Sequence, residues 1–350
     1  MAAVPDLISL AFAEKDNHGE LMIVWVYPKI ETACRELVLT KCESVISEDE
    51  TIALWFGQFQ RLWHYIVATS VKGSGTLDKV SDVYAIVQAK NFNPELYHAL
   101  GKVCLQEYIK SASPVNSLLH YLSVFTKGVC KMEDGSNFVV SEFPVKRAYL
   151  KTCLKETVSL FGMEVILLYT ALLLKRRIVV YSSKLSTLLD VCRSLPALVI
   201  HRLNWNIVFP LLQPSQEELE EVAQQRSYVV GVTDPTYINR TDLYDIFVNV
   251  SDCEIEINPQ SKEYFQMGKF HKDLAKFMVE TSNDEELSDQ DMIKELKRRT
   301  IDVITNLKSL DTENPDNPKI SLAMLQERKL TPTMQMFLFN LALAEGLDKA

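Results

Sequence analysis

Glycine is scarce in this chain, at 11 of 350 residues, and none of it forms a phosphate-binding loop. Such a loop needs the spacing GxxxxGK followed by Ser or Thr, because backbone amides cradle the phosphate and the lysine must reach it. The Gly-Lys pairs at 101 and 268 are followed by Val and Phe, and the glycines at 73 and 75 lack the further glycine of a dinucleotide fingerprint. We therefore expect no nucleotide and no other cofactor.

The motifs of common catalytic and metal sites are absent as well. The six histidines form no HExxH, and no serine lies in GxSxG. The seven cysteines include no CxxC pair and no histidine at zinc-finger spacing, so we expect buried free thiols in a reducing cytosol. The acid pairs Glu217-Glu218 and Glu220-Glu221 fall in a polar, helix-prone run and are expected to face solvent. No catalytic residue and no metal site is predicted.

No apolar run is long enough to cross a membrane. The longest, Val165 to Leu174, has ten residues and is followed at once by Lys175, Arg176 and Arg177, so it predicts a buried helix. The N-terminus has no basic segment followed by an apolar core, and residue 2 is Ala, where myristoylation needs Gly. We expect a cytoplasmic protein without direct membrane insertion.

Basic side chains are also fewer than acidic ones. The 37 basic and 46 acidic side chains give a formal net charge of -9, which argues against a nucleic-acid-binding surface and against recruitment by anionic lipid. Protein partners are favoured by elimination. With 47% hydrophobic residues in 350, the chain can build real cores and exceeds the usual size of one domain, so two lobes and an appendage are expected.

The first 128 residues follow an order of strand, strand, helix, three strands, two helices. Apolar residues on both faces of the first two runs indicate central strands, and the turn between them contains Asn17 and Gly19. Asn93 and Ser113 are expected to cap the two helices, the second of which carries an apolar face. The strands are expected at 7–14, 20–27, 51–59, 61–71 and 79–89, the first helix at 31–46, and the apolar face comprises Leu118, Leu119, Leu122 and Phe125.

From about residue 137 helices and strands alternate, which predicts a second sheet between helices. Beyond Pro259 the chain is expected to be helical, with a helix at 264–279 and another opened by a capping box of Ser288 and Asp291. The acidic stretch 283–291 and the segment 311–318 are expected to be linkers, the first of them solvated. The alternating part has expected strands at 138–143, 177–181, 206–211, 228–232 and 245–250, and expected helices within 150–174 and at 185–200.

Three stretches of this part resemble the DENN family. Residues 172–186 (LLLKRRIVVYSSKLS) are similar to its helix-into-strand signature, residues 205–212 (WNIVFPLL) to its tryptophan-to-proline strand, and residues 228–232 (YVVGV) to a further strand. Lys175 stands where the family usually has Glu, and residues 225–227 replace a Pro-containing entry to the last strand. Most of these motif residues are expected in the core, with Gly231 at a tight backbone position.

The resemblance implies an α/β DENN module. Residues 1–128 would form a longin-like upstream lobe, a five-stranded sheet with flanking helices. Residues 129–136 would be a linker, residues 137–257 the central α/β lobe, and residues 258–350 an all-helical downstream part.

The family also implies regulation of Rab-type small GTPases in endosomal trafficking, with recruitment to endosomes, late endosomes in particular. Guanine-nucleotide exchange is consistent with the absence of catalytic motifs. A GTPase that binds its nucleotide at picomolar affinity must lose roughly 16 kcal/mol of binding free energy to release it, and no single acid or base supplies that. A partner surface can supply it by stabilising an open switch conformation over an area on the order of 800 Å² per partner.

Two other functions stay open. The chain could be a non-exchanging interaction subunit docked on a coiled-coil scaffold of an endosomal sorting complex, because without a polybasic patch something must bring it to membranes. It could also assist GTP hydrolysis through an inserted arginine, for which the candidates by residue type are Arg176, Arg177, Arg202, Arg226 and Arg240.

Partner-binding residues are predicted only from their position. Lys184, Arg202 and Arg240 are polar and flank predicted strands, so the loops around them are expected to contact a partner. The pattern does not identify the GTPase or the scaffold.

Overall fold

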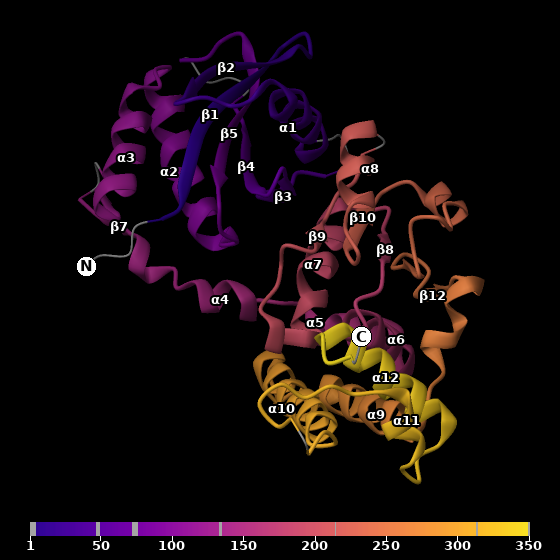
Figure 1. Cartoon of the computed structure of the whole chain (residues 1–350). Coiled ribbons are helices and arrows are strands. Elements are labelled where there is room, and N and C mark those ends of the chain that lie inside the picture. Colours follow the sequence, from indigo (N-terminus) through magenta and orange to yellow (C-terminus); the bar gives the residue numbers. More distant parts are fainter. Residues whose placement is uncertain are drawn as a thin grey trace. The chain divides into compact units, whose positions relative to one another are not determined.

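A computed structural model of the chain describes residues 5–46, 50–71, 76–132, 135–213, 215–312 and 314–348 (Figure 1). The chain divides into two compact units, Met1–Ala148 and Tyr149–Ala350, and each is described by itself. Gly73 and Gly75 lie outside the described residues. The expected domain limits stay a prediction.

The first unit contains a five-stranded antiparallel sheet, as predicted. The strand order is β2-β1-β5-β4-β3, and the β1–β2 hairpin turns at Gly19, whose φ of 93° favours glycine. All ten residues of the central strand β5 are buried. The strands are β1 (Leu7–Asp16), β2 (Leu21–Tyr27), β3 (Trp55–Phe59), β4 (Leu62–Ser70) and β5 (Val80–Ala89).

The expectation that both of the first strands are central is wrong for β2. Among the described residues no strand pairs with its outer edge, and its side chains are half-buried or exposed. β1 lies between β2 and β5 and its first seven residues are almost wholly buried. Both strands carry apolar residues on both faces, but only β1 is covered on both faces.

Helices cover the two faces of this sheet (Figure 1). α1 (Thr32–Val45) lies on one face and α2 (Pro94–Ser111) on the other, with α3 (Val115–Lys127) packed against α2. Asn93 caps α2 as expected, accepting from the backbone N–H of Leu96. The cap of α3 is Pro114, one residue later than predicted, and it makes no side-chain cap bond.

A short antiparallel pair follows, β6 (Val129–Lys131) with β7 (Asn137–Val139). The strand expected at 138–143 ends early, because residues 140–142 form a 3-10 turn, and the segment expected as a linker begins with β6. The next helix, α4 (Val145–Leu150), spans the division between the two units.

The second unit contains a mixed five-stranded sheet of order β12-β11-β8-β10-β9. β8, β9, β10 and β11 run parallel and β12 pairs antiparallel with β11. β12 was missed because it has four residues and because Cys253, with φ of 57°, occupies a turn position that glycine usually marks. The strands are β8 (Ile178–Tyr181), β9 (Val208–Phe209), β10 (Val229–Val232), β11 (Ile246–Asn249) and β12 (Glu254–Ile257).

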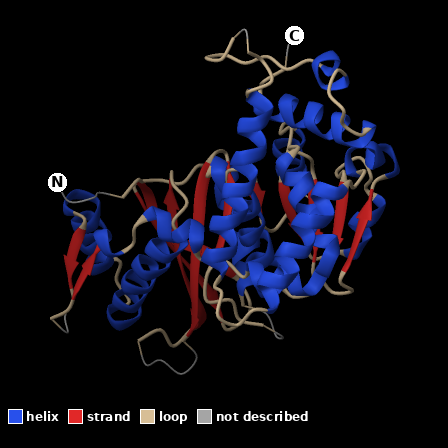
Figure 2. Cartoon of the chain, turned by 90° about the horizontal axis from the view of Figure 1, so that it is seen from below, coloured by secondary structure: helices blue, strands red, loops and turns tan. Residues whose placement is uncertain are grey.

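Helices flank the strands of this sheet (Figure 2). The long helix predicted at 185–200 ends at Ser194, and residues 195–202 form a 3-10 helix (η3) that opens with Pro196 near its start. Glu218 on α8 is buried, so the expectation of a solvent-facing acid pair is wrong there; its carboxylate accepts from the N–H of Gln213. The helices are α5 (Leu154–Phe161), α6 (Val165–Leu173), α7 (Leu185–Ser194) and α8 (Gln216–Ala223).

The most apolar stretch of the chain belongs to this core. By length and composition Val140–Leu173 could cross a membrane, but 61% of its most apolar window is buried inside the protein. Residues 151–153 and Gly162 break it into separate helices, and all but one of the residues of α6 are buried. The predicted buried helix is confirmed.

The last part is helical, as predicted, although the first long helix lies a few residues later than expected. α9 (Lys269–Asn283) follows a 3-10 turn (η5, Pro259–Phe265), and the capping box of Ser288 and Asp291 opens α10 (Asp289–Lys308). The remaining helices are α11 (Leu322–Gln326) and α12 (Pro332–Glu345).

The cysteines are unpaired. Five of them are buried, as predicted. Cys153 is half-buried and Cys253 is exposed, so burial was wrongly expected for the latter.

Candidate interaction surfaces

An apolar stripe on α3 faces outward in the first unit. We call it the α3 stripe: Val115, Leu118, Leu119, Leu122 and Phe125. The first, third and last are 58%, 60% and 43% exposed, and the other two are half-buried. Their spacing of three and four residues places them on one side of the helix. The sequence predicted an apolar face here, and the structure leaves it uncovered among the described residues.

The stripe points outward because α3 packs through a different and smaller set of side chains. Only Ser117, Tyr121 and Val124 are buried on this helix. Ser117 donates a hydrogen bond of 2.7 Å to the carbonyl of Cys104 on α2, which allows the two helices to approach closely. α3 therefore packs through Ser117, Tyr121 and Val124 and leaves much of its apolar side exposed.

The α3 stripe continues onto the edge strand β2. Tyr27, at the end of β2, is 37% exposed and meets the ring of Tyr121 edge-on at 6.1 Å between ring centroids. Tyr121 in turn stacks on Phe125 at 6.2 Å. Aromatic side chains linked in this way give a firm apolar surface of the kind that protein interfaces favour.

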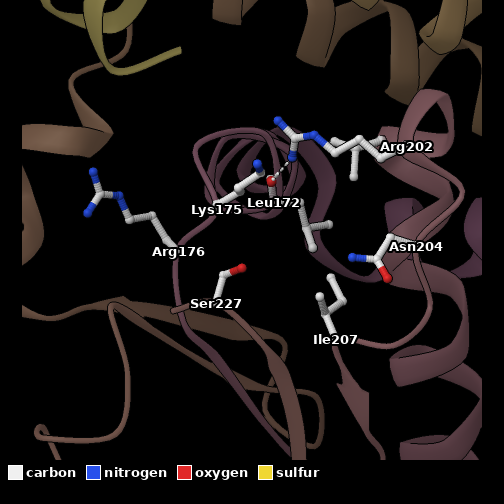
Figure 3. A pocket seen from close by; sticks show the side chains of 8 residues that line it. Leu172, Lys175, Arg176, Arg202, Asn204, Ile207 and Ser227 are labelled. Atoms are coloured by element: carbon white, nitrogen blue, oxygen red, sulfur yellow. Dashed lines mark hydrogen bonds between the residues drawn. The ribbon is translucent and has the colours of Figure 1, made fainter. Parts of the chain in front are cut away.

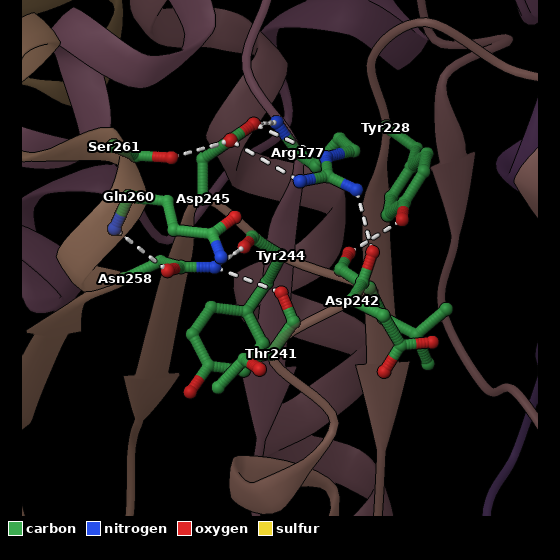
Figure 4. A network of polar contacts seen from close by, with 10 residues as sticks. Arg177, Tyr228, Thr241, Asp242, Tyr244, Asp245, Asn258, Gln260 and Ser261 are labelled. Atoms are coloured by element: carbon green, nitrogen blue, oxygen red, sulfur yellow. Dashed lines mark hydrogen bonds and ion pairs between the residues drawn. The ribbon is translucent and has the colours of Figure 1, made fainter.

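In the second unit, Arg177 is held by a polar network (Figure 4). Its guanidinium donates to both carboxylate oxygens of Asp245 at 3.3 Å and to the carbonyl of Asp242 at 2.6 Å. Asp245 also accepts from the hydroxyl of Ser261 at 2.7 Å. Burial by itself would raise the pKa of Asp245, but its hydrogen bonds and the charge of Arg177 outweigh this and lower it.

The network continues through Asn258, whose amide nitrogen donates to the carbonyls of Thr241 and Tyr244 at 2.8 Å each (Figure 4). These bonds fix the loop between β10 and β11 against the segment after β12. Arg177 is therefore a structural anchor, and extending it into a GTPase would break the network.

Arg202 likewise binds within its own unit. It donates to the backbone carbonyls of Leu172 and Leu173 at 2.7 Å each and pairs with the carboxylate of Glu345 at the end of α12. Its side chain is only 16% exposed. The predicted partner-binding role of Arg202 stays untested, but its guanidinium already ties α6, η3 and α12 together.

The other two predicted contact residues are exposed. Lys184 precedes α7, just beyond the carboxyl end of β8. Arg240 pairs with Asp242 at 2.8 Å, near the amino end of β8, where Arg202 also lies. The structure therefore places Arg202 and Arg240 near the amino ends of the parallel strands and Lys184 at their carboxyl ends, so the three do not form one site.

The remaining arginine candidates differ in their surroundings. Arg176 lies over the ring of Tyr264, with 3.3 Å from its Cζ to the ring centroid. Arg226 is exposed, and no hydrogen bond or ion pair joins it to another described residue. Within the described ranges, no group of three or more His, Cys, Asp and Glu side chains is arranged to hold a metal ion.

The sequence predicted the apolar face of α3 but not its exposure, and it did not predict Tyr27 as part of a surface. The apolar period of α3 was recognised, but the exposure of this face depends on which side of α3 packs against α2. The exposure of Tyr27 could not be predicted, because an apolar strand has the same sequence pattern at the edge of a sheet as in its centre.

Comparison with known proteins gives consistent relatives. A family model described as "Stabilization of polarity axis" matches residues 151–259. The chain is 40% identical over 348 residues to DENN domain-containing protein 10 of Danio rerio, covering 99% of each chain. It is 37% identical to the Homo sapiens protein of that name over 98% of this chain and 97% of the relative, and 38% identical to the Dictyostelium discoideum one over 97% of each. The resemblance to DENN proteins is confirmed.

Proposed function

Because the chain belongs to the family of DENN domain-containing protein 10, we propose that it regulates Rab-type small GTPases in endosomal trafficking, acting as a guanine-nucleotide exchange factor. The observation that carries this proposal is the likeness to these relatives over nearly the whole length of both chains. In this proposal the protein is cytoplasmic and is recruited to endosomes, in particular late endosomes.

The proposed mechanism needs a surface and no reacting group. A partner surface that binds the open switch conformation more tightly than the closed one lowers nucleotide affinity by that difference. The α3 stripe and Tyr27 supply apolar area for such binding. We propose these residues as GTPase contacts, in addition to Lys184, Arg202 and Arg240.

Release of fluorescent GDP from a panel of purified Rab proteins tests the proposal. We expect faster release from at least one Rab, and at least a tenfold loss of that acceleration in Leu119→Arg, because a charge at the centre of an apolar contact loses well over 1.4 kcal/mol. The matched control is Ile301→Arg on α10, an apolar side chain that is 41% exposed. If no Rab responds to the unaltered protein, the exchange proposal fails.

The second candidate is a non-exchanging subunit docked on a coiled-coil scaffold of an endosomal sorting complex. The α3 stripe favours it, since apolar residues at alternating steps of three and four match the seam of a helical partner. Affinity capture of the tagged protein at low salt, followed by mass spectrometry, tests this. A stoichiometric coiled-coil partner that is retained by Ile301→Arg and lost with Leu119→Arg supports it; recovery of Rab proteins alone contradicts it.

A further inference from the structure

A small cavity lies in the second unit, at the amino ends of the parallel strands of its sheet (Figure 3). Its volume is about 40 Å³, enough for a group of a few atoms and too small for a nucleotide. Its walls include residues from the end of α6, from the end of η3 and from the segment just before β10. It is lined by Leu172, Lys175, Arg176, Val199, Arg202, Asn204, Ile207 and Ser227.

Two acceptor groups at this cavity already have partners. The carbonyl of Leu172 accepts from Arg202, whose guanidinium also holds Glu345. The side-chain oxygen of Asn204 accepts from the N–H of Asn206 at 3.1 Å. This last bond fixes the orientation of the amide, so the nitrogen of Asn204 is the atom directed into the cavity (Figure 3).

Hydrogen-bond donors remain. The ammonium of Lys175 and the hydroxyl of Ser227 form no hydrogen bond or ion pair with any described residue, and Ser227 points into the cavity (Figure 3). Together with the amide nitrogen of Asn204, they give three donors from three separate segments. The guanidinium of Arg176 does not join them, because it turns away to lie over Tyr264.

The local charge is positive although the whole chain is negative. Burial lowers the pKa of Lys175, and the charges of Arg202 and Arg226 lower it further, while Glu345 opposes them in part. The backbone of Lys175 has a φ of 52°, a left-handed conformation that is costly for a lysine and that directs this residue out of the end of α6. An anion would relieve the repulsion between these cations.

We propose that this cavity binds a phosphate group, with Lys175, Ser227 and Asn204 as its donors. A phosphate offers several acceptor oxygens and a charge near −2, which matches a donor-rich cavity next to fixed positive charge. The group could come from a soluble phosphate ester or from the head group of a phosphorylated lipid. The site is independent of any GTPase, so its test does not depend on the proposed function.

Binding is measured by calorimetry on the full chain. Inorganic phosphate and a soluble inositol phosphate are titrated at constant ionic strength, with sodium acetate as the comparison anion. Co-sedimentation with phosphatidylcholine vesicles, with and without a phosphatidylinositol monophosphate, tests the lipid source. Binding of the soluble compounds alone assigns a soluble source, and tighter binding of the phosphorylated vesicles assigns a lipid.

Two substitutions locate the site. Lys175→Gln is expected to weaken binding about tenfold and Ser227→Ala about three- to tenfold, the loss expected for one charged and one neutral donor to an anion. Lys272→Gln, an exposed lysine on α9 that does not line the cavity, should leave binding unchanged. Circular dichroism melts confirm that each variant is folded. The proposal is overturned if phosphate binds no better than acetate, or if the first two variants bind as well as the third.

Discussion

Single residues in this protein hold elements that are far apart in the sequence. Arg177 joins the start of β8 to the loop before β11, and Arg202 joins the ends of α6 and η3 to α12. Both arginines are bound by carboxylates and backbone carbonyls of the chain itself. Removing such a side chain would leave buried acceptors unpaired, so its effect on folding must be separated from any effect on partners.

At the scale of one residue, Gly231→Ala is expected to lower the free energy of unfolding by about 2–3 kcal/mol. A Cβ there would lie 2.2 Å from the carbonyl oxygen of Pro210, and backbone cannot move aside as a side chain can. This bears out the tight position expected from the sequence. Chemical denaturation measures the loss.

The control for this substitution is Gly268→Ala. A Cβ at Gly268 has nothing within 4 Å, and a change of less than about 1 kcal/mol is expected for this N-cap. Equal losses in the two variants would mean that close packing is not what requires Gly231.

At the scale of elements, the acidic stretch 283–291 is exposed along most of its length, as predicted, but Asp289, the first residue of α10, binds the start of α5. Asp289 accepts from the hydroxyl of Thr152 and from the backbone N–H groups of Leu154 and Lys155, at 2.6, 2.6 and 3.1 Å. It satisfies the free donors at the start of a helix about 135 residues earlier in the chain.

Asp289→Ala is therefore expected to destabilise the protein by about 1–2 kcal/mol, as loss of a helix cap does. Urea denaturation followed by circular dichroism measures the change. Asp273→Ala on α9, an exposed acid, should cost less than about 0.5 kcal/mol. A loss no greater than that of the control would show that the cap adds nothing.

The docking of α12 is expected to depend on pH through Glu345. Burial would raise the pKa of Glu345, but its contacts with His201 and Arg202 outweigh burial and lower it to about 2. A carboxylate with a lowered pKa stabilises the fold above its unfolded pKa of about 4.5, and this contribution disappears as the pH falls toward 2.

Glu345→Gln should therefore cost about 2 kcal/mol at pH 7 and progressively less as the pH is lowered from about 5. The measurement is the difference in unfolding free energy between the two proteins at each pH, which cancels the titration of groups that do not contact Glu345. A difference that does not change with pH would contradict the assignment.

At the scale of the molecule, each compact unit has a core of its own. In the first unit, Trp63, Tyr65 and Tyr97 are wholly buried. The ring centroids of Trp63 and Tyr65 are 6.5 Å apart, and those of Tyr65 and Tyr97 are 4.6 Å apart. α2 supplies one of these rings and covers one face of the sheet. The unit has the parts that independent folding requires.

A fragment of residues 1–148 is expected to fold alone and to unfold cooperatively, with tryptophan fluorescence and circular dichroism giving the same midpoint in urea. A fragment of residues 1–89, which lacks α2 and α3, should fail this test because one face of its sheet would be bare. Non-coincident transitions in the longer fragment would show that its core is incomplete.

The sequence by itself determined the features that depend on local chemistry. The β1–β2 turn at Gly19, the Asn93 cap, the capping box of Ser288 and Asp291 and the buried helix α6 all follow from residues within a few positions of one another. The DENN motifs add the order of the elements around β8 and β10, because strands buried on both sides keep a recognisable apolar pattern.

Only the tertiary structure decided which of these features face outward and which side chains meet. The period of α3 showed that one face is apolar but not that Leu119 would be exposed, since that depends on what packs beside the helix. Charge and position suggested Arg202 as a contact residue, yet Glu345, 143 positions away, engages it. The cavity of Lys175, Asn204 and Ser227 likewise joins separate segments, because contacts between distant residues arise from the packing of elements and leave no mark on local periodicity.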